Sequence, residues 1–141
     1  MKYPRSPFPL GRVFNAACAN LDRWVSDQVA PPEAAAIATL DMKTALDENA
    51  NALGGWRTPY VDVPTGTWFG NAAPSIADSL ICYLAGYHVP FDQAKLMSLY
   101  PTRDDYLRRV TESADAAVEQ RFLLAADARE IVAEAMRARV P

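Results

Sequence analysis

The middle of the chain is organised around the stretch Asn51-Ala52-Leu53-Gly54-Gly55-Trp56-Arg57-Thr58-Pro59-Tyr60-Val61-Asp62-Val63-Pro64. The paired glycines permit positive φ angles, and the two prolines fix φ and remove backbone donors. We therefore expect a tightly constrained path that contains no regular helix. The stretch holds no nucleophile–base pair, so it is typical of a structural element and not of a reaction centre.

The composition is that of one globular domain. Half of the 141 residues are apolar and 22% are charged, a balance typical of folded chains. The net charge is -3 and no basic stripe alternates with aromatic residues, so we expect no nucleic-acid partner. No apolar run approaches the length of a membrane span, and residues 1–9 lack the apolar segment of a signal peptide.

Leu10 to Val29 is predicted to form an amphipathic helix. Apolar side chains recur at spacings of three and four until Pro31-Pro32, which ends the pattern. Trp24 is expected to be a core residue. The predicted apolar face consists of Val13, Phe14, Ala17, Cys18, Leu21, Trp24 and Val25.

Three more helices are predicted after Phe91. Asp92 is expected to cap a short helix from Gln93 to about Tyr100, and Thr102, with Asp105 three residues on, to cap a longer one. A final helix from about Asp127 to about Arg139 should pack against it as an antiparallel hairpin. The inward residues are predicted to be Tyr106, Val110, Ala114, Ala117, Val118 and Phe122 on the first of these two helices, and Leu124, Ala128, Ile131, Val132, Ala135 and Met136 on the second.

The segment between these helices is predicted to be mostly loops. Ile37–Leu40 is a weak strand candidate and Trp56–Val63 a better one, although Pro59 confines it to an edge or a bulge. So long an irregular segment indicates a functional excursion or a surface laid over something else, and we favour the second. The predicted fold is mainly α with long irregular loops and a few short β-strands. It forms a single region, 1–141, made of an N-terminal helix (1–30), an irregular belt (31–90) and a helical hairpin (91–141).

Few residues suggest chemistry. His88 stands in a predicted loop, where a lone histidine is more often structural than catalytic, and Cys82 lies six residues earlier. Cys18 and Cys82 fit either one disulfide or two buried thiols, and we expect buried thiols.

Asp47, Asn49 and Asn51 match the first three oxygen positions of a calcium loop. Ala52 stands where that loop needs glycine and Thr58 where it needs the bidentate acid. Asx turns explain the same residues without a cation. We expect no metal, no cofactor and no catalytic residue in this chain.

Trp68-Phe69 lies beside Gly66 and Gly70 in a predicted loop, and 141 residues do not easily bury such a pair. With Trp56 and Arg57, these residues are the candidate contacts to a partner or to a substrate entrance.

Several strings, in a fixed order, carry a family resemblance. They are Leu21-Asp22-Arg23-Trp24-Val25-Ser26-Asp27-Gln28-Val29-Ala30-Pro31-Pro32, Gly54-Gly55-Trp56-Arg57-Thr58-Pro59, Val61-Asp62-Val63-Pro64, Val89-Pro90-Phe91, Leu99-Tyr100-Pro101-Thr102 and Asp105-Tyr106. From about Leu10 to about Ala135, the chain resembles the C-terminal part of a bacterial family usually called "alpha/beta hydrolase domain-containing protein".

The resemblance implies the C-terminal segment of an α/β-hydrolase-type serine hydrolase. In that family the nucleophile elbow lies well upstream, and the catalytic histidine comes just ahead of the helix that Leu10 to Val29 resembles. His88 is not at that position, and this chain has no Gly-x-Ser-x-Gly elbow. The expected partner is therefore a missing N-terminal catalytic domain or a second chain that supplies it, with this chain inactive alone as a fragment, a split gene product or a truncated reading frame.

Three hypotheses follow. In the first, the chain supports such a hydrolase, and Val13, Phe14 and Trp24 leave an exposed apolar face when the chain is alone. In the second, it is an autonomous helical module whose partner docks on Trp68-Phe69. In the third, it is a small enzyme that uses Cys82 and His88.

Overall fold

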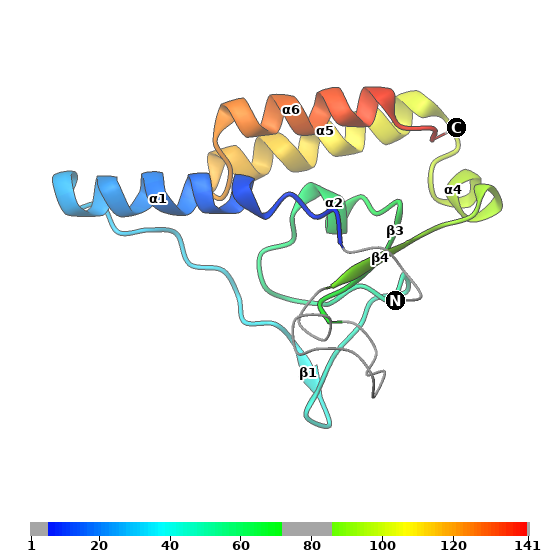
Figure 1. Ribbon diagram of the computed structural model, residues 1–141, viewed down its shortest axis with the longest axis horizontal. Helices are drawn as coiled ribbons and strands as arrows, with labels where there is room; N and C mark the ends of the chain where they lie inside the picture. Colours follow the sequence, from blue (N-terminus) through cyan, green and yellow to red (C-terminus); the bar gives the residue numbers. More distant parts are fainter. Residues whose placement is uncertain (1–5, 72–85, 141) are drawn as a thin grey trace.

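The computed structural model describes residues 6–71 and 86–140 (Figure 1). In the ribbon view, the two long C-terminal helices lie side by side, and α1 extends beyond their end. The loop-rich segment with β1, β3 and β4 lies on the side of α1 and α2 that faces away from these two helices. The predicted mainly helical fold with a few short strands is confirmed. None of the helices in the described ranges combines the length and the apolar character that a membrane crossing needs.

The hairpin of α5 (Arg103–Glu119) and α6 (Ala125–Arg137) forms much of the core. The Thr102 hydroxyl accepts from the Asp105 amide at 3.1 Å, so the predicted cap is confirmed. The residues of these helices that are buried are Tyr106, Val110, Ala114 and Ala117 on α5 and Asp127, Ala128, Ile131 and Ala135 on α6.

Two predictions on α6 are wrong in detail. The helix begins at Ala125 and ends at Arg137, and the sequence placed both bounds two residues late. Leu124 and Met136, predicted to point inward, are 37% and 56% exposed. Leu124 precedes the first helical turn, and Met136 lies about 100° around the helix from the buried Ala135.

Helix α4 (Gln93–Leu99) has the predicted position and cap. The Asp92 carboxylate accepts from the Lys95 amide at 2.8 Å. Leu96 from this helix and Tyr100 just after it enter the same core as the hairpin. The chain between α4 and α5 therefore returns directly to the main packing centre.

Helix α1 (Leu10–Asp27) also confirms its prediction, but most of its apolar face is uncovered. Its C-cap Gln28 adopts a left-handed conformation ahead of Pro31-Pro32. Ala16 and Asn20 are the buried residues of the helix. Trp24 is 49% exposed, so its expected burial in a core is wrong for the described chain.

The exposed face expected from the first hypothesis is present. Phe14 is 59% exposed and Val13 is half-buried. Cys18 is exposed with a free thiol, so its predicted burial is wrong, while Cys82 lies outside the described residues. Phe14 and Cys18 are exposed because the hairpin contacts only one side of α1.

The belt contains a short hairpin of β1 (Thr39–Leu40) and β2 (Lys43–Thr44). Asp41 and Met42 at its tip have φ angles of 49° and 60°, as a two-residue type I′ turn requires. The strand predicted at Ile37–Leu40 is thus confirmed in its second half, while Ile37 forms an isolated bridge with Gly54.

The strand predicted at Trp56–Val63 is wrong. Residues Pro59–Asp62 form the single-turn helix α2, in which the Thr58 carbonyl accepts from the Val61 and Asp62 amides at 2.8 and 2.9 Å. Proline suits the first position of a helix, because its φ is already helical and its missing N–H is not needed there. The expectation of no helix in this stretch is therefore also wrong.

A second antiparallel pair joins β3 (Gly66–Phe69) to β4 (Tyr87–Pro90), with Trp68 opposite His88. Both segments were predicted as loops. A Cβ at Gly66 would lie 2.5 Å from the Val89 carbonyl oxygen, a backbone atom of the partner strand, so glycine suits this position.

Candidate functional site

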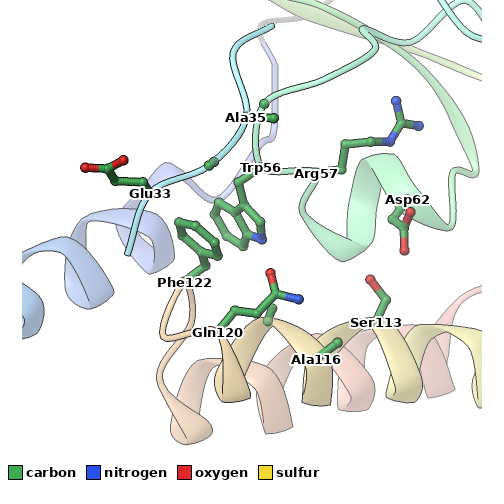
Figure 2. Close-up of a pocket in the computed structure, with 12 residues that line it drawn as sticks. Glu33, Ala35, Trp56, Arg57, Asp62, Ser113, Ala116, Gln120 and Phe122 are labelled. Carbon is green, nitrogen blue, oxygen red and sulfur yellow. The ribbon is translucent and has the colours of Figure 1, made fainter. Parts of the chain in front are cut away.

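The centre of the candidate site is a stacked pair, Trp56 and Phe122. Their ring centroids are 5.1 Å apart and the planes differ by 15° (Figure 2). Trp56 comes from the constrained stretch and Phe122 from the α5–α6 connection. Both residues line two separate hollows, so the pair forms a wall between them.

The first hollow, of about 330 Å³, lies between the Gly55–Arg57 corner and α5. Figure 2 shows Asp62, Ser113 and Gln120 around it. Among the described residues that line it, no hydrogen bond joins a nucleophile to a base.

Arg57 lines this hollow, but its guanidinium points away from Gln120 and Ser113 in Figure 2. Nη2 donates to Asp47 Oδ2 at 2.6 Å and to the Val61 carbonyl at 2.9 Å, and Nη1 donates to the Ala52 carbonyl. The side chain therefore ties the two ends of the constrained stretch together. Its predicted contact with a partner or substrate stays a prediction.

The Asp47 turn is an Asx-type structure, as the alternative to a calcium loop predicted. Asp47 Oδ1 accepts from the Asn49 and Asn51 amides at 2.8 and 2.9 Å. Burial alone raises the pKa of Asp47, but these amides and Arg57 outweigh it, so the net pKa is lowered. Within residues 6–71 and 86–140, no group of three or more His, Cys, Asp or Glu could hold a metal ion.

The second hollow, of about 340 Å³, lies between α1 and the Trp56–Phe122 wall. We call it the α1 hollow. Asn20 at its edge donates through Nδ2 to the Arg121 carbonyl at 2.7 Å, which fixes the helix against the α5–α6 connection. The residues that line it are Val13, Ala16, Ala17, Asn20, Leu21, Trp24, Pro31, Pro32, Trp56, Arg121 and Phe122.

A polar cluster joins α1, α2 and α6. Arg12 contacts Glu134 at 2.6 and 3.0 Å and Glu130 at 3.1 Å, and it also donates to the Tyr60 hydroxyl. The Tyr60 hydroxyl donates to Glu134 at 2.6 Å. Arg12 lowers the pKa of Glu134, while burial raises the pKa of Tyr60. The tyrosine is therefore a neutral hydrogen-bond donor near pH 7, and the cluster holds three elements together.

The other candidate residues lie around the β3–β4 pair. Trp68 donates through its indole to the Tyr60 carbonyl at 3.0 Å, and its ring lies 4.1 Å from the His88 ring. Phe69 stacks on Tyr87 at 4.4 Å and is 38% exposed. Trp68 thus packs mainly within the chain, and Phe69 is the more accessible of the two.

His88 has no catalytic arrangement in the described part of the chain. Burial lowers its pKa, and its Nε2 atom is buried without a hydrogen-bond partner. Cys82, its proposed partner, lies outside the described residues, so the structure does not address that pairing.

Arg12, Glu134 and Arg121 were not singled out in the sequence. Arg12 and Glu134 are separated by most of the chain, so no local pattern links them. Arg121 carried a weak signal, because a charged residue follows the end of α5 at a position where glycine is common.

Residues 1–133 match the protein family described as "Alpha/beta hydrolase domain". The match covers more than half of the chain, which therefore belongs to this family, and the resemblance seen in the sequence is confirmed. The comparisons with curated proteins and with solved structures gave no match.

Proposed function

We propose that this chain is the C-terminal segment of an α/β-hydrolase-type serine hydrolase that cleaves esters or amides. In this proposal it carries no catalytic residue. It supports the catalytic domain and shapes the substrate entrance, with Trp56, Arg57, Trp68 and Phe69 as the candidate contacts. Family membership supports the hydrolase class, and the uncovered face of α1 supports the packing role.

The observation that carries the proposal is an apolar stripe on α1. Its members recur at spacings of three and four and are all exposed, and we call them the outer stripe: Leu10, Phe14, Cys18, Leu21 and Val25. An exposed apolar stripe along a helix that is held to its own chain by polar side chains is typical of a surface that packs against another body. The second body in this proposal is the catalytic domain.

The genetic test is the DNA upstream of Met1. We expect it to encode, in frame or as a neighbouring gene, a Gly-x-Ser-x-Gly segment followed by a histidine. The chain alone should not hydrolyse p-nitrophenyl esters, and co-expression with the upstream product should give a complex that does. Upstream DNA without such a segment would contradict the proposal.

Cys18 provides a biochemical test, because it lies on the outer stripe. In a Cys82→Ser background, a thiol reagent should label Cys18 readily in the chain alone and at least about tenfold more slowly in the complex, since burial blocks access. Ser26→Cys, placed at an exposed position of α1 in a Cys18→Ser, Cys82→Ser background, is the control and should label equally in both. Equal labelling of Cys18 in both would sink the packing role.

A further inference from the structure

The α1 hollow combines apolar walls with one charged residue. Trp24 and the Trp56–Phe122 wall face it from opposite elements, and its volume of about 340 Å³ is within the range of small-molecule sites. Of the residues that line it, Arg121 is the charged one. The hollow is separate from the outer stripe except at Leu21, which borders both.

The Arg121 guanidinium has an unmet hydrogen-bonding requirement. Nη2 donates to the Ala30 carbonyl at 2.9 Å, whereas Nη1 is buried and has no hydrogen-bond partner. A buried guanidinium N–H without an acceptor is unfavourable, and a carboxylate is the acceptor that suits it best. Arg121 lines the α1 hollow, so an acceptor bound there would meet this requirement.

Arg121 follows the end of α5 in a left-handed backbone conformation. Its φ is 63°, a left-handed conformation that glycine adopts without strain and arginine does not. Replacing Arg121 by glycine would remove the strain of this left-handed conformation. It would also remove the hydrogen bond from the Arg121 guanidinium to the Ala30 carbonyl.

We propose that the α1 hollow binds an amphipathic carboxylate. The apolar part of the ligand lies between Trp24 and the Trp56–Phe122 wall, and its carboxylate accepts from Arg121. This site consists of residues of this chain alone, so it goes beyond the proposed function and does not depend on it.

The experiment compares octanoate with octan-1-ol, which has the same chain length and no charge. Binding to the purified 141-residue chain is followed by tryptophan fluorescence, because Trp24 and Trp56 line the hollow, and by calorimetry. We expect octanoate to bind about tenfold or more tightly than octan-1-ol, the gain of one charge-assisted hydrogen bond. Absence of octanoate binding, or equal affinity for the two probes, would overturn the proposal.

Arg121→Gly separates function from folding. It removes the charge and relieves the left-handed strain, so the variant should fold, and its preference for octanoate should fall to within about twofold of parity. Arg23→Gln, an equal loss of charge on α1 outside the hollow, should keep the preference. A preference that survives in Arg121→Gly would overturn the proposal.

Ala17→Phe tests the location. Ala17 is exposed and lines the hollow, so a larger ring there should weaken both probes about tenfold without touching Arg121. Unchanged affinity for both probes in this variant would place the ligand elsewhere and contradict the proposal.

Discussion

The side-chain amide of Asn51 forms hydrogen bonds to the backbone of β3, as the backbone of a neighbouring strand would. Its Oδ1 accepts from the Trp68 amide at 2.8 Å, and its Nδ2 donates to the Gly66 carbonyl at 3.2 Å. Asn51 is 1% exposed, so water cannot replace either bond. The constrained stretch is thereby joined to β3 through a single residue.

Asn51→Ala should lower the free energy of unfolding by about 2–4 kcal/mol, because it leaves a buried donor and a buried acceptor without partners. Urea denaturation followed by circular dichroism measures the change. Asn49→Ala is the matched control, since the Asn49 side-chain oxygen is buried without a partner, and it should cost less than about 1 kcal/mol. Equal losses in the two variants would contradict this account.

Gly54 occupies a backbone position where any side chain would cause strain. Its φ is 75°, and an added Cβ would lie 2.4 Å from the Ala36 carbonyl oxygen and 2.7 Å from the Ala38 nitrogen. Gly54→Ala should therefore destabilise the chain by about 2 kcal/mol or more. Gly11→Ala meets no atom within 4 Å in a helix and should be neutral or slightly stabilising in the same urea assay. A tolerated Gly54→Ala would show that the backbone there is free to move.

At the scale of elements, the helices could be predicted from the sequence because their signals are local. Asp92 and Thr102 cap helices as predicted, and Pro31-Pro32 follows the end of α1. The strands β3 and β4 could not be predicted, because each becomes regular only by pairing with a segment far along the chain. Alternation at Trp56–Val63 was misleading, since Pro59 starts a helical turn there.

Thr102→Ala should destabilise α5 by about 1 kcal/mol, because the Asp105 amide loses its acceptor. Thermal unfolding measures the effect. Thr102→Ser keeps the hydroxyl and should stay within about 0.5 kcal/mol of the parent chain. If both variants lost the same stability, the methyl group of Thr102, and not the cap, would be the stabilising part.

At the scale of the whole molecule, stability should depend on pH through Glu134. Arg12 and Tyr60 lower the pKa of this carboxyl from its ordinary 4.5, and burial opposes them only in part. A carboxyl whose pKa is lower in the folded state contributes stability that is fully present above about pH 5 and is lost as pH falls through the folded value.

Glu134→Gln should therefore lower the free energy of unfolding at pH 7 and flatten its decline between pH 5 and pH 3. The Glu134 side chain is 43% exposed, so we expect only about 1 kcal/mol after solvent screening. Glu119→Gln, which removes an exposed carboxylate at the end of α5, is the control for the loss of one charge. Parallel profiles for Glu134→Gln and the parent chain would exclude this role.

The sequence singled out Trp56 but not the residue on which it stacks, and the role predicted for Trp56 stays a prediction. Trp56 could be singled out because it stands in a constrained stretch, whereas its stacking on Phe122 depends on how the hairpin lies against the belt. The same holds for Arg57, whose charge is visible in the sequence and whose ion pair with Asp47 is not. Contacts that depend on the three-dimensional path leave no local pattern.

The polar attachment of α1 has a consequence for the order in which the molecule opens. Its hydrogen bonds to the hairpin come from Arg12, Asn15 and Asn20, and the described apolar core draws its members from other segments. Backbone amide hydrogens of α1 should therefore exchange with deuterium through local opening of the helix. Those of α5 and α6 should exchange only when the whole chain unfolds. Moderate salt should accelerate exchange in α1 alone, and uniform exchange across all three helices would show that they open as one cooperative unit.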